Sequence, residues 1–228
     1  MAKKKRTISK PLSAVSDKPG SILLRWKEFA DQHKNWIYGT LAGVIIIIAG
    51  IFGIRYYSAV SQDRAYVLYE KGMEIRRELE LKKDTPSTNR TGIDAFDEVL
   101  TRYPDTEAAK LTCIAYGDYE YGNGNYDQAI AHYLQALRAV ESEPLMKAFV
   151  LNSIGYCYEE KKDYKRASGY FTKILDSENK MLKDLAHFSL ARAYEAMGDA
   201  PDALSQYEII VKDYPDSIHF QAAEERVY

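Results

Sequence analysis

The pattern of apolar and polar residues divides the chain into two unlike parts. Residues 36–54, WIYGTLAGVIIIIAGIFGI, are nineteen consecutive residues without a charged side chain. As an α-helix rising about 1.5 Å per residue, this stretch is about as long as a bilayer's hydrocarbon core is thick. After it, apolar residues recur at helical spacing between charged ones, which is typical of packed helices in water. We therefore predict one membrane-spanning helix over residues 36–57, followed by an all-α domain over residues 58–228.

Aromatic residues mark both ends of the apolar stretch. Trp36 and Tyr38 lie at its start, and Tyr56 and Tyr57 follow its end. Tryptophan and tyrosine are enriched where a spanning helix meets the headgroup region. The preceding segment, residues 21–35, alternates apolar residues at helical spacing with charges, which indicates an amphipathic juxtamembrane helix. A plain linker is the alternative for this segment.

Charge is distributed unevenly along the chain. Residues 1–55 carry ten lysines or arginines and three acidic residues, a balance of +7, whereas the rest of the chain has a balance of −9. Basic residues next to a span mark its cytoplasmic side. We therefore predict a basic cytoplasmic tail over residues 1–20 and a single-pass membrane protein whose C-terminal domain lies across the membrane. In a bacterium this is an inner-membrane protein with a periplasmic domain. The acidic domain should repel phosphate groups, so we predict no nucleic-acid partner.

A cleaved signal peptide is the alternative to a permanent anchor. The apolar run is longer than the usual about 7–15 residues of such a peptide. Residues 55–57, Arg-Tyr-Tyr, are bulky where cleavage requires small side chains, and residues 59–61 make a poor cleavage site. No cysteine precedes Cys113, which excludes a lipoprotein anchor. We expect an uncleaved span.

The domain after the span repeats itself. The stretch LNSIGYCYEEKKDYKRASGYFTKIL, which begins at Leu151, follows the tetratricopeptide pattern of paired helices. A small residue of the second helix recurs at Gly92, Ala129, Ala167 and Ala203, with gaps of 37, 38 and 36 residues, slightly above the usual period of about 34. The predicted fold is therefore all-α, a tetratricopeptide-repeat helical solenoid preceded by one transmembrane helix. Its repeats cover residues 62–105, 109–143, 147–180 and 184–217, and a closing helix covers residues 218–228.

Small and aromatic residues explain why such helices pair. A glycine or alanine lets two helices approach closely, and aromatic residues fill the space on either side. We therefore expect most of the nineteen tyrosines to be core residues. Two segments depart from the pattern. Glu120 stands where a tyrosine is expected, which leaves open a one-residue shift of the helix near Gly122, and a long first helix over residues 62–82 is followed by the loop KKDTPSTNRTG.

No catalytic or metal-binding motif is recognisable in the sequence. It has no phosphate-binding loop, no GxSxG and no HExxH, so we predict no enzyme and no catalytic, cofactor-binding or metal-binding residues. Cys113 and Cys157 are predicted to be small buried residues on helices, with a disulfide between adjacent helices as the alternative. Asp163 and Asp199 stand at turns between helices, where helix capping explains them.

The predicted interaction site is the face formed by the first helices of the repeats. Stacked helix pairs form a concave groove that these helices line. Aromatic, asparagine and arginine side chains on such a surface suit an extended or helical peptide, and an ordinary solvated face is the alternative. From the helical phase, the predicted groove residues are Asp118, Tyr121, Asn152, Tyr156, Glu159, Phe188, Arg192 and Glu195.

These segments together resemble the ancillary subunit family of the bacterial Sec translocon. The resemblance is carried by the basic segment LLRWKEFADQHKNW, by FGIRYY at the end of the span, and by the repeats that close on RYPDT and DYPDS. Such closings also occur in envelope lipoproteins of the outer-membrane assembly machine and in the Tol-associated division coordinator, but those families lack this uncleaved anchor. The resemblance implies a non-enzymatic protein beside the Sec channel that binds periplasmic chaperones and helps emerging proteins on.

The predicted function is a membrane-anchored protein–protein interaction module. We expect an accessory of the Sec translocon that links it to periplasmic chaperones, with proteins or peptides as partners and no cofactor. A scaffold for cell-envelope assembly or division proteins is the alternative with the same fold. Self-association into a homo-oligomer is also left open, because Gly39 and Gly43 would allow two spans to pack closely.

Overall fold

The computed structural model describes residues 19–82, 89–177 and 180–228. The chain divides into two compact units, residues 1–57 and residues 58–228. Helix α1 (Pro19–Lys82) contributes to both units.

The first unit consists of the N-terminal part of α1. The helix is interrupted at His33, whose backbone is non-helical with φ −113° and ψ 15°. The ring of His33 stacks on that of Phe29, with the ring centroids 4.4 Å apart. The kink lies near the predicted junction between the amphipathic segment and the span. The side chains of most apolar residues in the predicted amphipathic segment, Ile22 and Trp26 among them, lie outside the described residues, as does most of the predicted basic tail.

The apolar stretch follows this kink. Within Asp31–Glu78, α1 is long and apolar enough to cross a membrane, and no residue of its most apolar window is buried. Ile46 and Phe52, for example, are 72% and 70% exposed. Apolar surface of this extent is costly in water, whereas a helix satisfies the hydrogen-bonding demands of lipid by itself. The segment is therefore a candidate membrane span or signal anchor.

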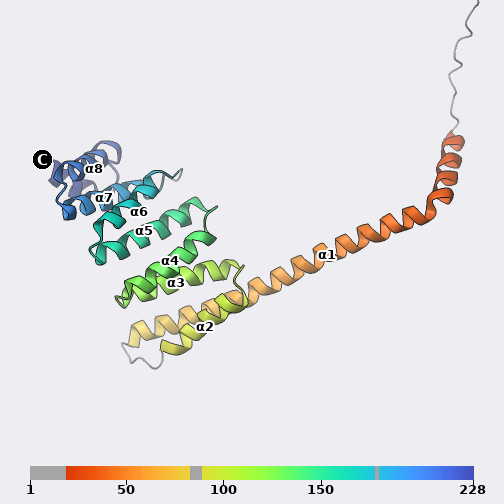
Figure 1. The fold of residues 1–228 in the computed structure, drawn as a ribbon, viewed down its shortest axis with the longest axis horizontal. Helices are drawn as coiled ribbons and strands as arrows, with labels where there is room; N and C mark the ends of the chain where they lie inside the picture. The colour runs from red at the N-terminus through yellow and green to blue at the C-terminus, as the bar shows by residue number, and fades with distance from the viewer. Residues whose placement is uncertain (1–18, 83–88, 178–179) are drawn as a thin grey trace, which may run out of the picture. The chain divides into compact units, whose positions relative to one another are not determined.

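The second unit is a stack of helix pairs. The C-terminal part of α1 and α2 (Asn89–Arg102) form the first pair, and three further pairs and a short last helix follow (Figure 1). These elements are α3 (Glu107–Gly122), α4 (Tyr126–Ala139), α5 (Pro144–Glu160), α6 (Tyr164–Leu175), α7 (Lys183–Met197), α8 (Ala200–Asp213) and α9 (Phe220–Val227). From α2 to α9, consecutive helices pack against one another, and α1 contacts α2 through Gly72 and Phe96. Every regular element in the described ranges is a helix, which confirms the all-α prediction.

A small residue of each first helix lies against an aromatic ring of the second. A methyl group added at the small residue would overlap the ring. The pairs are Gly72 with Phe96, Gly117 with Tyr133 and Gly155 with Phe171. These rings are at most 3% exposed, and the predicted small residues Ala129, Ala167 and Ala203 are at most 2% exposed. In these three pairs the close approach of the two helices therefore requires glycine, whereas α7 carries the buried Ala191; the repeat pattern predicts a glycine or an alanine.

The first pair differs from the others in its connection. Gly117 and Gly155 are each sixteen residues from their aromatic partner, whereas Gly72 is twenty-four residues from Phe96. The steric contact is thus kept although the segment between the two helices is longer. The surroundings of Gly92 lie outside the described residues.

Two predicted details change in the structure. Helix α2 begins at Asn89, so the prediction that the loop KKDTPSTNRTG extends to Gly92 is wrong, because the polar residues from Asn89 onward form the first helical turn. Helix α3 continues without interruption to Gly122, so the shift that Glu120 left open does not occur. Glu120 instead accepts a hydrogen bond from Asn125 Nδ2 at 2.7 Å, in the turn that follows.

Side-chain caps fix the starts of three helices. Thr106 Oγ1 accepts a hydrogen bond from the backbone N–H of Ala109 at 3.2 Å, at the start of α3. Asp163 and Asp199 accept equivalent bonds at the starts of α6 and α8, which confirms their predicted capping roles. Each such cap is typically worth about 1 kcal/mol.

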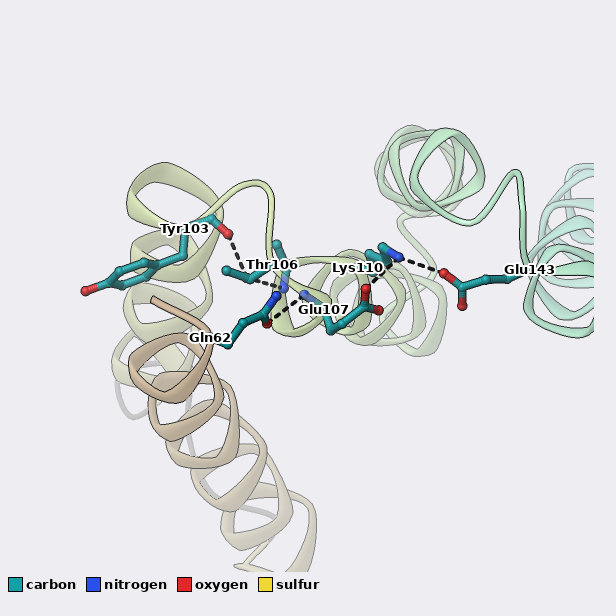
Figure 2. Close-up of polar contacts among 7 residues, drawn as sticks. Gln62, Tyr103, Thr106, Glu107, Lys110 and Glu143 are labelled. Atoms are coloured by element: carbon teal, nitrogen blue, oxygen red, sulfur yellow. Dashed lines mark hydrogen bonds and ion pairs between the residues drawn. The ribbon is translucent and has the colours of Figure 1, made fainter. Parts of the chain in front are cut away.

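Polar contacts also connect α3 to its neighbours (Figure 2). Gln62 Oε1, on α1, accepts a hydrogen bond from the backbone N–H of Glu107 at 3.1 Å. Lys110 Nζ forms ion pairs with Glu107 at 2.9 Å and with Glu143, just before α5, at 2.7 Å. These pairs are partly exposed and each contributes less than about 1 kcal/mol. They therefore help to orient neighbouring helices in a stack that apolar packing stabilises.

The turn inside each later pair contains a left-handed residue. Gly124 and Gly198 have φ angles of 78° and 80°, and Lys162 takes the corresponding place between α5 and α6 with φ 59°. A side chain disfavours this conformation by about 1–2 kcal/mol relative to glycine. Lys162 is therefore a strained residue at a position where the other two turns use glycine.

Candidate functional site

The eight predicted groove residues lie on α3, α5 and α7, the first helices of three successive pairs. In helical-repeat solenoids, this side of the stack provides the extended binding surface. We call the set the first-helix face, and it consists of Asp118, Tyr121, Asn152, Tyr156, Glu159, Phe188, Arg192 and Glu195. Its members range from buried to exposed, and most of them contact a neighbouring helix.

Two contacts join α5 to α7 on this face. The hydroxyl of Tyr156 lies 3.3 Å from Ser189 Oγ, and Arg192 forms an ion pair with Glu159 at 3.2 Å. The Glu159 side chain is only 11% exposed, whereas that of Arg192 is 50% exposed. Burial raises the pKa of Glu159, and the positive charge of Arg192 opposes that rise. The guanidinium thus opposes the effect of burial on this carboxyl while remaining accessible itself.

The same arrangement recurs between α7 and α9. Arg226 pairs with Glu195, which also accepts a hydrogen bond from the hydroxyl of Tyr207 at 3.0 Å. The ring of Phe188 stacks on His219, with centroids 4.4 Å apart. Sequence reasoning missed Arg226. Its place about one repeat after Arg192 would have indicated the same role, since Glu195 follows Glu159 at a similar interval.

The α3 part of the face is acidic and aromatic. Asp118 is exposed and accepts a hydrogen bond from the hydroxyl of Tyr133 at 2.6 Å. The rings of Tyr121 and Tyr126 meet edge to face at 5.5 Å. Burial, followed by the nearby carboxylate of Glu160, raises the pKa of Tyr121 to about 12. Tyr121 is therefore a neutral hydrogen-bonding group at all physiological pH values.

On α5, one predicted surface residue is buried, and two exposed apolar residues were not predicted. Asn152 was predicted to point to the surface, but it is only 8% exposed. Leu145 and Phe149 precede it on the same helix and are 40% and 47% exposed. Their four-residue spacing places them on the side of α5 that carries Asn152 and Tyr156. The four-residue spacing of Leu145 and Phe149 is visible in the sequence, but the repeat pattern begins at Leu151 and covers only the later turns of α5.

The two cysteines are part of the core. Cys113 and Cys157 are free, and they are 3% and 0% exposed. Burial raises the pKa of the Cys113 thiol to about 11 and that of the Cys157 thiol to about 12. The prediction of small buried residues is therefore confirmed, and the structure contains no disulfide between them.

Two family models match the repeat region of the chain. Residues 107–180 match a family model described as tetratricopeptide repeat, and residues 185–217 match a second model with the same description. Among solved structures, the chain is similar to the TPR domain of FLU from Arabidopsis, with 18% identity over 47% of this chain and 96% of that chain, and a TM-score of 0.43. No curated protein matches the chain. Residues 107–180 and 185–217 are therefore tetratricopeptide repeats, and such repeats indicate a protein–protein interaction module.

Proposed function

We propose that the chain is an accessory of the bacterial Sec translocon that links the channel to periplasmic chaperones. In this proposal α1 anchors the chain in the inner membrane with the N-terminus in the cytoplasm, and the repeat domain lies in the periplasm. The observation that carries the proposal is the order of the segments, namely a basic head, one exposed apolar helix and an acidic repeat domain.

The chemistry of the repeat domain supports a binding role. The first-helix face presents aromatic rings, an arginine and carboxylates, which are the groups that interfaces use to anchor a partner. An anchor in the membrane confines the domain near a membrane-bound partner and raises its effective concentration there. Weak affinity of each contact is therefore sufficient for such a role.

Photo-crosslinking in cells tests the identity of the partners. Tyr156 is replaced by a photoreactive amino acid, and the products are identified by mass spectrometry. Its partly buried ring lies on the first-helix face, so a molecule bound there comes within reach. Sec channel subunits, periplasmic chaperones or emerging secreted chains are the expected products. Division, Tol or cell-wall proteins would instead establish the envelope scaffold and overturn the Sec assignment.

Protease protection tests the orientation independently. We expect protease added outside intact spheroplasts to digest the repeat domain, with a known periplasmic protein as the positive control and a cytoplasmic one as the negative control. A repeat domain that stays intact while the periplasmic control is cut would overturn the proposed topology.

Light scattering of the chain in lipid nanodiscs tests self-association. A monomer at all concentrations would exclude a homo-oligomer.

A further inference from the structure

The second helices of the first three pairs have an outer side that points away from the first helices. In each pair a buried ring of the second helix lies against a glycine of the first, namely Phe96 on α2, Tyr133 on α4 and Phe171 on α6. A residue two positions from such a ring is turned by about 200° around the helix axis, so it points outward. The residues two positions before these rings are Asp94, Ala131 and Gly169, and all three are exposed. We call the exposed side of α2, α4 and α6 the second-helix face, which also carries Asp97, Lys165 and Lys173.

Along the second-helix face the charge changes sign. On α2, Asp94 and Asp97 are exposed carboxylates. On α6 every charged residue is basic, namely Lys165, Arg166 and Lys173. This is unusual, because the chain beyond residue 55 has a balance of −9. The face therefore has an acidic helix at one side, a basic helix at the other, and α4 between them.

These charges are not used within the domain. In the described ranges, the ion pairs on α2 and α6 involve other residues. Lys165 and Asp94 take part in none of them, and Lys173 Nζ lies over the ring of Tyr170, 4.3 Å from its centroid. A lysine over an aromatic ring keeps its charge and can still meet a carboxylate. Both helices thus present charges that are available to a second molecule.

Side-chain contacts place the three helices in order along the stack. Between α2 and α4, the hydroxyl of Tyr116 donates a hydrogen bond to Asp97 at 3.0 Å, and its ring stacks on His132 with centroids 4.3 Å apart. Between α4 and α6, Asp127 forms an ion pair with Lys161, in the turn before α6. The acidic helix and the basic helix therefore lie on opposite sides of α4, each one repeat away from it.

Gly169 is a second unusual feature of α6. A glycine in the middle of a helix is destabilising relative to alanine. A methyl group added at Gly155 would overlap a ring, whereas one added at Gly169 would meet no atom within 4 Å. Packing within the domain therefore gives no reason for glycine at this position. Its bare backbone, together with the small side chain of Ala131, allows a helix of another molecule to approach closely.

We propose that two copies of the chain associate through their second-helix faces, with a two-fold axis that passes through α4. Residues next to such an axis meet their own counterparts, so small uncharged residues such as Ala131 are suited to it. The same axis brings α6 of each copy to α2 of the other, because these helices lie on opposite sides of α4. Lys165 and Lys173 of one copy then face the carboxylates of Asp94 and Asp97 in its partner. The chain itself thus supplies the complementary charge at the place that the symmetry requires.

The second-helix face is separate from the first-helix face. The predicted groove residues lie on α3, α5 and α7, so association through α2, α4 and α6 leaves both first-helix faces free. The inference therefore does not rest on the proposed function. A pair of copies is compatible with Sec components and with envelope proteins as partners, and it doubles the number of faces that one assembly offers to them.

Disulfide crosslinking of the full chain in membrane vesicles tests the position of the axis. The starting variant is Cys113→Ala/Cys157→Ala, which has no thiol of its own. Adding Ala131→Cys should give a covalent dimer on mild oxidation, because the two new thiols meet at the axis. Ser205→Cys is the matched control, since Ser205 is exposed on α8 two positions before the ring of Tyr207. The control should crosslink at least about tenfold more slowly, because it lies two repeats from the axis.

Charge reversal tests the contact between α6 and α2. With Ala131→Cys present, Lys173→Glu should slow the crosslinking about tenfold, because the change makes the contact repulsive at both of its symmetric places. Adding Asp94→Lys should restore the rate, since the charges are then exchanged and attract again. Lys212→Glu is the matched control, because it makes the same change at an exposed position on α8. It should leave the rate unchanged.

Three results would each overturn the proposed association. They are the absence of a dimer from Ala131→Cys, equal crosslinking of Ser205→Cys, and no restoration by Asp94→Lys. Copies held together by their spans alone would give the second or the third result. Circular dichroism during heating controls for folding, and we expect the charge variants to unfold at the temperature of the starting variant because the substituted residues are exposed.

Discussion

The two sides of helix α5 differ in how closely their side chains are packed. On the packed side, Gly155 lies against the ring of Phe171, and Cys157 is fully buried. On the side that carries the first-helix face, Leu145 and Phe149 remain exposed, and Asn152 keeps an unpaired oxygen. The first side is close to an optimum for folding, whereas the second carries features that lower the stability of the isolated chain.

This difference separates what the helix does for the fold from what it offers to a partner. Substitutions on the packed side should change the free energy of unfolding, because they alter steric contacts that every repeat uses. Substitutions on the first-helix face should change binding and leave unfolding almost unaffected. The predictions below test this division, from the largest expected effect to the smallest.

Thiol reactivity should distinguish the two sides most strongly. In a Cys113→Ala variant, the remaining Cys157 is 0% exposed, and burial raises the pKa of its thiol to about 12. Because a thiolate must form and the helix must open before reaction, we expect labelling by Ellman's reagent to be about a thousandfold slower than for an unfolded chain.

The matched control places a thiol on the other side of α5. A Phe149→Cys variant that also lacks both natural cysteines carries its thiol where the native side chain is 47% exposed. This thiol should react nearly as fast as that of an unfolded peptide. If Cys157 reacted within about tenfold of this control, the description of the packed side would be wrong.

The second prediction concerns two glycines of one helix pair. Gly155→Ala adds a methyl group that would overlap the ring of Phe171. We expect it to lower the free energy of unfolding by about 1–3 kcal/mol. Gly169→Ala, in the middle of α6 where nothing lies within 4 Å, should instead raise it by about 0.5–1 kcal/mol. Denaturant unfolding of both variants gives the comparison. Equal effects of the two changes would show that helix propensity, and not the close contact, governs both sites.

The third prediction uses the strained turn after α5. Lys162→Gly should raise the free energy of unfolding by about 1 kcal/mol, because φ 59° is unfavourable for a lysine. Gly198→Ala, at the corresponding turn with φ 80°, should lower it by a similar amount. A destabilised Lys162→Gly variant in denaturant unfolding would mean that the lysine side chain contributes more than its backbone strain costs.

The fold could be predicted from the sequence because it depends on periodic steric contacts. The small residues at Ala129, Ala167 and Ala203 were read directly from their spacing, and all three are buried where the helices meet. The same holds for the caps at Asp163 and Asp199, since capping is a local property of the turn. The sidedness of the membrane anchor remains a prediction from charge alone.

Less of the candidate surface could be predicted from the sequence. The helical phase selected Asn152 but gave no sign that its side chain is buried, because burial depends on how neighbouring side chains pack around it. Contacts between successive repeats, such as that of Arg226 with Glu195, depend on how far each helix is shifted along the stack. A pattern within one repeat contains no information about that shift.

The smallest effect on stability is expected for Arg192→Ala. Arg192 is half exposed, so its ion pair with Glu159 contributes less than about 1 kcal/mol at neutral pH. The substitution should nevertheless leave a pH signature. Burial raises the pKa of Glu159 and Arg192 opposes that rise, so removal of the arginine raises the pKa further. A carboxyl with a raised pKa in the folded chain stabilises the fold below the pKa of the unfolded chain, and this contribution is lost as the pH rises through the folded value.

The loss caused by Arg192→Ala should therefore be present at pH 7 and become smaller as the pH falls toward about 4.5. Urea unfolding at the two pH values measures it. Arg102→Ala is the control, because Arg102 and Glu98 form a more exposed pair within α2, and its effect should be small at both pH values. A loss of the same size at both pH values for Arg192→Ala would mean that the arginine acts through packing of its stem. In that case the charge of Arg192 would not be what opposes the effect of burial on the pKa of Glu159.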